Sequence, residues 1–252
     1  MTRALALCLG AVALLIGTLP SLAQAPVPPA PPATAPAPTL EPFVAQYEVF
    51  RGGRTLGAAT LQVVRQAPPR WRVDLTMRGT GLVGLAGINA EQSTVFDAAG
   101  RAYRPISQAT RRSALFTKRA TTGTYDWSTK SARWTGDVKK TRRVPVALQD
   151  GDMSGLLINL AVVRDARPGV VLSYRFVDDG RVREHRYTVS PQTEPVTVGD
   201  LQFDAMRVSR VNAGGEETVI WVAEGVPTPI RMLQRENGAD TYDLRLLEYK
   251  GA

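Results

Sequence analysis

The residues best suited to chemistry in this sequence form a run of positive charges. Twelve lysine and arginine residues lie between Arg101 and Arg143, against two acidic residues, Asp126 and Asp137. This stretch carries +10 over 43 residues, whereas the rest of the chain after residue 23 carries −3. Such side chains attract phosphates and carboxylates over a Debye length of about 8 Å. The candidate anion-binding residues are Arg111, Arg112, Lys118, Arg119, Lys139, Lys140, Arg142 and Arg143.

Two other interpretations of this basic stretch are open. The charges could be the solvated side of half-buried strands, with no ligand. Aromatic residues are also interleaved with them, which is typical of a stacking platform for single-stranded nucleic acid. These aromatic residues are Tyr103, Phe116, Tyr125, Trp127 and Trp134. The export signal described below argues against a nucleic-acid partner, so none is expected.

Side chains for covalent or metal catalysis are scarce. The chain has a single cysteine, Cys8, and a single histidine, His185, and it lacks the G-x-S-x-G pattern of a nucleophile elbow. Thiolate and multi-histidine zinc sites are therefore excluded. Alternation places His185 on the side of Tyr187 and Val189, as a polar strand residue. We predict no catalytic residue, no metal and no cofactor.

Paired carboxylates are the remaining candidates for catalysis. The pairs are Asp150 with Asp152, Asp178 with Asp179, and Glu216 with Glu217. All fall in predicted turns, which favour aspartate because its side chain bonds to nearby backbone. The segment Asp150-Gly151-Asp152 also lacks the third ligand and the closing glutamate of a calcium loop. Turn and capping roles are expected, and a hydrolase that uses carboxylates alone is kept as an alternative.

A glycine-rich segment matches a nucleotide-binding pattern. Gly79-Thr80-Gly81-Leu82-Val83-Gly84 fits G-x-G-x-x-G and follows a predicted strand. A dinucleotide site needs a helix between two parallel strands. The strand-like residues Ser93 to Phe96 follow too closely to leave room for that helix. We expect instead that Gly79 to Gly87 form a loop over one mouth of the sheet.

The first residues predict export. Met1-Thr2-Arg3 gives a positive start, and Ala4 to Gly17 is an uncharged apolar stretch, which is typical of a signal peptide and too short for a transmembrane helix. Cleavage is expected after Ala23, with Ala25 as the competing site. The mature chain would then contain no cysteine and no transmembrane segment, and the expected compartment is the periplasm.

Three regions are expected along the chain: a signal peptide over 1–23, a proline- and alanine-rich linker over 24–40, and a single β-rich domain over 41–252. Residues 26–42 include 8 prolines in 17 positions, which favours extended polyproline II over packed structure.

Alternation with a period of two predicts an all-β, mainly antiparallel domain. In residues 70–78, the apolar side chains Trp71, Val73, Leu75 and Met77 share one face and polar side chains occupy the other. Recurring turn signals, such as Asn237-Gly238, predict consecutive hairpins. The expected architecture is a curved meander sheet, or a partly closed β-barrel or β-spiral, of about eleven strands.

One segment predicts a helix. Met153, Leu156, Leu157, Leu160 and Val163 have helical spacing and end before Arg167-Pro168-Gly169. We expect one amphipathic helix that covers the sheet, with Asp152 as its N-cap.

Scattered motifs resemble a bacterial exported family called domain of unknown function 3108. They are Pro42 to Val49 with Gly53 and Gly57, Asp152-Met153-Ser154, Trp221 to Arg231, and Tyr242 to Leu246. The resemblance spans most of residues 41–252 and implies a periplasmic β-rich protein of unassigned role, without catalytic residues to carry over. The expected shape also looks like that of periplasmic lipoprotein carriers and β-spiral envelope proteins, at the level of fold.

The leading functional hypothesis is a non-enzymatic periplasmic protein that maintains the cell envelope by binding. Its expected partners are anionic lipid, lipopolysaccharide or envelope proteins. The first alternative is a carrier that encloses a lipid or other apolar ligand, with Gly79 to Gly87 as a movable lid. The second is the carboxylate-dependent hydrolase.

Overall fold

Apolar residues at every second position build a sheet, as the sequence predicts. In β3 (Arg70–Gly79), Trp71 and Val73 are buried, and Leu75 and Met77 are partly buried on the same face.

The computed structural model describes residues 39–81, 89–114, 117–211 and 215–251. The predicted signal peptide, most of the linker and most of the predicted lid lie outside these residues. Residues Ala37–Ala252 form one compact unit.

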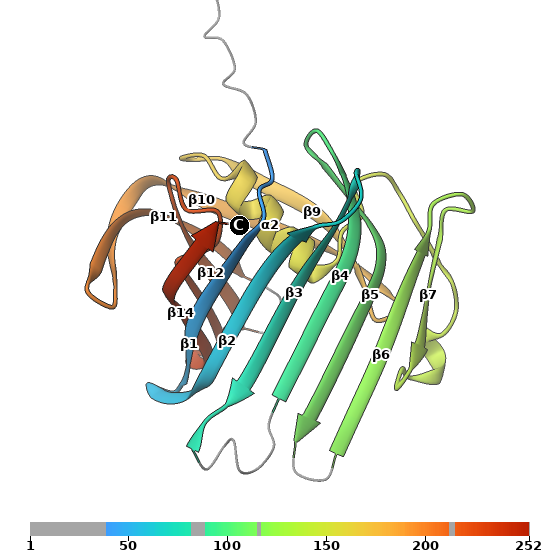
Figure 1. The fold of residues 1–252 in the computed structure, drawn as a ribbon, viewed down its shortest axis with the longest axis horizontal. Helices are drawn as coiled ribbons and strands as arrows, with labels where there is room; N and C mark the ends of the chain where they lie inside the picture. Colours follow the sequence, from blue (N-terminus) through green and yellow to red (C-terminus); the bar gives the residue numbers. More distant parts are fainter. Residues whose placement is uncertain (1–38, 82–88, 115–116, 212–214, 252) are drawn as a thin grey trace, which may run out of the picture. The chain divides into compact units, whose positions relative to one another are not determined.

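In the described residues, 14 strands form one antiparallel sheet that does not close on itself (Figure 1). The spatial order is β8-β7-β6-β5-β4-β3-β2-β1-β14-β13-β12-β11-β10-β9. The strands other than β3 are β1 (Phe43–Arg51), β2 (Arg54–Arg65), β4 (Asn89–Ala99), β5 (Ala102–Ala114), β6 (Thr117–Asp126), β7 (Ser131–Gly136), β8 (Val146–Ala147), β9 (Val171–Asp178), β10 (Arg181–Val198), β11 (Leu201–Val211), β12 (Glu216–Ala223), β13 (Arg231–Glu236) and β14 (Ala239–Gly251).

The mainly antiparallel all-β class is therefore confirmed, but the count of eleven strands is wrong. Some strands give almost no sequence signal. Strand β8 spans two residues, too few for any alternation, and the first half of β6 is polar and exposed on both faces. The glycine-rich segment is the connection between β3 and β4, which pair antiparallel, so the parallel unit required by a dinucleotide site is absent there.

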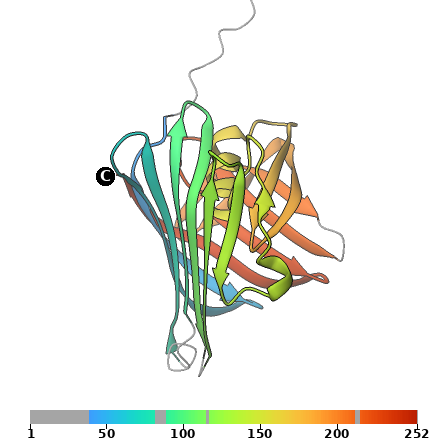
Figure 2. The same ribbon diagram turned by 90° about the vertical axis from the view of Figure 1, so that its right-hand side faces the viewer.

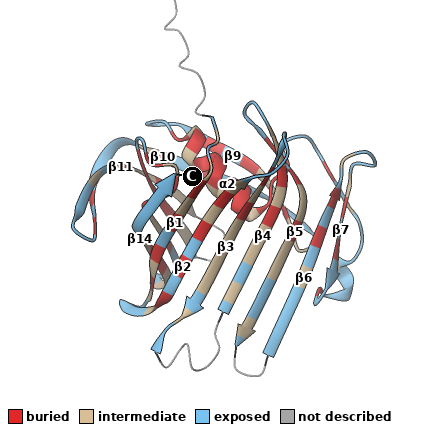
Figure 3. Cartoon of the chain, viewed as in Figure 1, coloured by how far each residue is buried: buried red, intermediate tan, exposed pale blue. Residues whose placement is uncertain are grey.

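The predicted helix exists, but it does not merely cover the sheet. Helix α2 (Gly155–Asp165) lies inside the curve, in contact with β3, β4 and β5 on one side and β9 on the other (Figure 2). Leu157, Ile158 and Val162 are all buried, so apolar contacts surround most of the helix. The helix therefore forms the centre of the main core, and Figure 3 shows burial concentrated around it.

The predicted N-cap is wrong. Ser154 is the N-cap residue, with extended backbone, and its hydroxyl bonds to that of Thr94 rather than to the first helical turn. Asp152 lies two residues earlier and is fully buried. Its carboxylate accepts a hydrogen bond from the backbone N–H of Gln149 at 2.8 Å and forms an ion pair with Arg175. Asp152 therefore fixes the turn before the helix and ties it to β9.

The segment around Asp152 joins the two edges of the sheet. Val146 and Ala147 pair with β7, and the N–H of Leu148 donates to the carbonyl of Lys130. On the other side, Met153 exchanges two backbone hydrogen bonds of 3.0 Å with β9, to the carbonyl of Arg175 and from the N–H of Val177. This junction between the two edges of the sheet is the seam. A small second core, which includes Trp134, packs there.

The strand that contains Trp221, β12, is an interior strand of the sheet, with β11 and β13 on its two sides and apolar residues on both faces. Val219 and Ile220 point to opposite faces, and both are buried. The corner after this strand is held by hydrogen bonds from β1. The hydroxyl of Tyr47 donates to the carbonyl of Pro229 at 2.9 Å and bonds to Thr228, which is fully buried.

Candidate anion-binding groove

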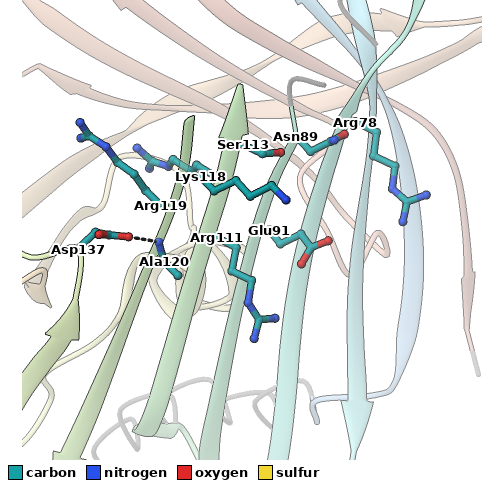
Figure 4. A pocket seen from close by; sticks show the side chains of 10 residues that line it. Arg78, Asn89, Glu91, Arg111, Ser113, Lys118, Arg119, Ala120 and Asp137 are labelled. Carbon is teal, nitrogen blue, oxygen red and sulfur yellow. Dashed lines mark hydrogen bonds between the residues drawn. The ribbon is translucent and has the colours of Figure 1, made fainter. Parts of the chain in front are cut away.

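A groove lies where β3 ends, β4 begins, β5 ends and β6 begins, on the face of the sheet that points away from α2. The groove has a volume of about 680 Å³ (Figure 4). Its lining includes four of the eight predicted basic residues, and it adds one arginine that the sequence did not single out. These five cations are Arg78, Arg111, Arg112, Lys118 and Arg119. A second hollow, of about 370 Å³, lies beside it, and Arg78 lines both.

Strand register explains why residues far apart in the sequence meet here. Two rows of cross-strand neighbours cross β2 to β6 on this outer face. The first row is Ala58, Arg78, Asn89, Ser113 and Lys118. The second row is Thr60, Thr76, Glu91, Arg111 and Ala120. Because side chains alternate along a strand, both rows point away from the core. The groove thus runs across the strands. Long charged side chains form its sides, and small side chains form its floor.

Three cations of the groove form no ion pair within the described ranges. About half of the other cations pair with carboxylates, as Arg70 does with Asp97 at 2.9 Å, whereas others, such as Arg54 and Arg186, are also unpaired among the described residues. In the described part of the chain, no carboxylate oxygen lies within 4 Å of the charged nitrogens of Arg78, Arg111 or Lys118. All three side chains are exposed. Uncompensated positive charge therefore collects on this face.

Two arginines also face each other directly. Arg112 on β5 is the cross-strand partner of Arg119 on β6. Like charges directly opposite each other in a sheet are destabilising. Alternation directs both side chains toward the face opposite to that of Lys118, and Figure 4 shows Arg119 extending away from Arg111 and Lys118. Both side chains therefore point away from Arg78, Arg111 and Lys118, and they mark the β5–β6 end of the groove.

One edge of the groove is built from a backbone contact. Asp137 follows β7, and its carboxylate accepts the N–H of Ala120 at 2.7 Å. The N–H of Asp137 in turn donates to the carbonyl of Ala120 at 2.8 Å. Just before it, Gly136 has a φ of 87°, and an added Cβ there would lie 2.2 Å from the Ala120 carbonyl oxygen. Glycine is therefore required where this edge is formed.

The other four predicted residues do not lie on strands. Lys139 precedes the 3-10 helix η1 (Lys140–Arg142), which follows β7. Arg142 forms an ion pair with Asp179, and the guanidinium of Arg143 donates to the carbonyl of Val138 at 3.3 Å. The basic stretch therefore contributes to two different places. Its strand residues line the groove, and the arginines of the turn after β7 bind other groups of the protein.

The interleaved aromatic residues do not form a stacking platform. Tyr103, Tyr125 and Trp134 are buried in the two cores. Trp127 is half-buried, and its indole donates to the carbonyl of Pro105 at 2.7 Å. Phe116 lies outside the described residues. Tyr103 and Trp134 point inward, whereas their chain neighbours Arg104 and Arg133 point to the solvated face.

The predicted carboxylate pairs contact partners within the protein. Asp150 is paired with Arg104, Asp152 with Arg175, Asp179 with Arg142, and Glu217 with Arg207 and Arg235. Burial raises the pKa of Asp178, which accepts a hydrogen bond from Gln108. The hydroxyl of Tyr125 donates to Gln108 and to the carbonyl of Val177. This network links β5 and β6 to the tip of the β9–β10 hairpin.

His185 is a buried strand residue on the face of Tyr187 and Val189, as predicted. Its ring stacks on that of Phe176, with 4.5 Å between centroids. Burial, aided by the positive charges of Arg210 and Arg183, lowers the pKa of His185 to about 4. The imidazole is therefore neutral at pH 7.

The shifted pKa predicts a loss of stability in acid. An unfolded histidine, with a pKa near 6.5, takes up a proton where the folded one does not, so stability present at neutral pH is lost as the pH falls from about 6.5 to about 4. Replacing His185 by phenylalanine keeps the ring contact and removes the titration. We expect the urea midpoint of H185F to fall less between pH 7 and pH 5 than that of the wild type. Equal decreases in both proteins would rule out this role.

The fold and the groove define an all-β, β-barrel-like protein with an exposed cationic surface. The chain belongs to the family described as "Protein of unknown function (DUF3108)", whose sequence profile matches residues 46–245. Membership of the family that its motifs resemble is thus confirmed. Comparison with curated proteins finds no match.

A solved structure shares the architecture. A crystal structure of a β-barrel-like protein of domain of unknown function DUF1849 from Brucella abortus is similar over 84% of this chain and 98% of that chain, with 9% identity and a TM-score of 0.52. A putative outer membrane lipoprotein-sorting protein domain from Vibrio parahaemolyticus matches over 84% and 85%, with 5% identity and a TM-score of 0.21. The first of these similarities supports the fold.

Proposed function

We propose that this protein is exported to the periplasm and acts there, without enzymatic activity, by binding an anionic component of the envelope. The ligand would be a phosphate-bearing amphiphile such as an anionic lipid or lipopolysaccharide. The observation that carries this proposal is the groove on β3 to β6, where the exposed cations Arg78, Arg111 and Lys118 gather without carboxylate partners among the described residues. Charge-assisted hydrogen bonds to phosphate are among the strongest that a protein surface can make.

The two alternatives have less support. A carrier of an apolar ligand needs space inside the sheet, but α2 places Leu157, Ile158 and Val162 there. A carboxylate-dependent hydrolase needs two carboxyl groups that face a substrate. Asp152 is fully buried against Arg175, and Asp150 is exposed beside Arg104.

Vesicle binding tests the proposal. The mature protein should bind vesicles that contain phosphatidylglycerol and should not bind vesicles of phosphatidylcholine alone, as measured by co-sedimentation. Because surface attraction is screened by salt, raising the ionic strength from 0.05 to 0.5 M should weaken binding markedly. Equal binding to both vesicle types, or binding that salt leaves unchanged, would argue against an anionic ligand.

A further inference from the structure

The arrangement of charge along the groove indicates what kind of anion it fits. Arg78 and Lys118 belong to the same cross-strand row. They lie on β3 and β6, three strand spacings apart, which corresponds to about 14 Å between their backbones. Asn89 and Ser113 occupy the positions between them. Positive charge is thus placed at two separated points, with polar uncharged residues in the middle of the row.

The second row adds one negative and one positive charge between Arg78 and Lys118, and so no net charge. Glu91 on β4 is exposed and stands directly opposite Arg111 on β5. A carboxylate in the middle of the groove repels an anion that binds over it, but it readily accepts hydrogen bonds from hydroxyl or amide groups. The groove is therefore poorly matched to a ligand with evenly spaced negative charge. It is better matched to one whose negative charges lie at its two ends.

We infer that the ligand is an amphiphile with a saccharide headgroup phosphorylated at both ends, bound across strands β3 to β6. One phosphate would contact Arg78, and the other would contact Lys118. The hydroxyl and amide groups of the sugar would lie over Glu91. This inference rests on the proposed function and specifies the ligand class of the same groove. It requires that one phosphate alone, or two phosphates held close together, bind more weakly.

A series of lipids tests the spacing. Phosphatidylcholine vesicles would contain diphosphoryl lipid A, monophosphoryl lipid A or cardiolipin, at concentrations that give equal surface charge. Cardiolipin serves as the control for two phosphates joined by a short linker. We expect diphosphoryl lipid A to bind about tenfold more tightly than either of the others, since one charged hydrogen-bonded contact contributes about that factor. The deacylated diphosphoryl disaccharide should compete if the groove recognises the headgroup, and failure to compete would refute recognition of the saccharide.

Single substitutions test whether two ends are used. R78Q and K118Q should each lower the affinity for diphosphoryl lipid A about tenfold, to that of the monophosphoryl form. For monophosphoryl lipid A, each variant should lose no more than about twofold, because the other end remains. The control is R133Q, because Arg133 is exposed on the same outer face of β7 and does not line the groove. It should match the wild type with every lipid.

The outcomes separate the two proposals. Equal affinities for all three lipids at equal surface charge would refute the spaced-phosphate site and leave the proposed anion binding intact. An absence of binding to every anionic vesicle would refute both. Thermal unfolding of R78Q and K118Q at the wild-type temperature would show that lost binding does not come from lost folding, as expected for exposed residues.

Discussion

Neutralising the groove should reduce affinity for anionic vesicles about a thousandfold. The variant replaces Arg78, Arg111, Lys118 and Arg119 by glutamine. Each basic side chain near an anionic membrane surface contributes about 1 kcal/mol, so four contribute about 4 kcal/mol, or about three factors of ten in affinity. Co-sedimentation with phosphatidylglycerol vesicles at low salt measures the effect. The four residues are exposed, so the fold should persist.

A second variant distinguishes binding in the groove from attraction by the net charge of the protein. Arg54, Lys130, Arg133 and Arg186 are exposed, do not line the groove and form no ion pair among the described residues. Replacing these four by glutamine removes the same charge from scattered positions. This control should lose far less affinity than the groove variant. If both lose the same amount, binding follows overall charge and the groove is not a site.

Removing the Asp152 carboxylate should destabilise the protein by about 4 kcal/mol. Asp152 is fully buried, and D152A would leave Arg175 without its partner and the N–H of Gln149 without an acceptor. Breaking a buried ion pair by removing one partner costs about 3–5 kcal/mol. Native proteins have only about 5–15 kcal/mol of stability in total, so this is a large fraction. The free energy of unfolding in urea measures it.

Its neighbour provides the matched control. Asp150 lies two residues away, in the same loop, and its side chain is 74% exposed. Its contact with Arg104 is a surface ion pair, so D150A should change stability by less than about 0.5 kcal/mol. If D152A and D150A had equal effects, the proposed role of Asp152 in holding the seam between β7 and β9 would be wrong.

Part of the groove could be predicted from composition, because β5 and β6 are consecutive. Arg112 and Arg119 fall within one basic stretch, and a hairpin brings them opposite each other. Arg78 lies outside that stretch, and only the register of β3 on β4 places it in the same row as Lys118. A shift of one residue would turn it to the opposite face.

Other corrections have similar causes. Asp152 has the sequence signature of a helix cap, but its burial and its pairing with Arg175 come from β9, which a local pattern does not contain. The sequence predicts that Arg142 is part of a positive face, but in the structure the β9–β10 hairpin brings Asp179 to it. In each case the partner comes from a part of the sheet remote in the chain.

By itself, the sequence determined the antiparallel β class, the presence of helix α2 and the membership of the family, because alternation, helical spacing and short motifs are local properties of the chain. Only the tertiary structure decided which cations are left without carboxylate partners and that they lie in two rows across β2 to β6. Cross-strand neighbours are set by register and by the packing of the sheet around α2, and both depend on contacts between residues far apart in the chain.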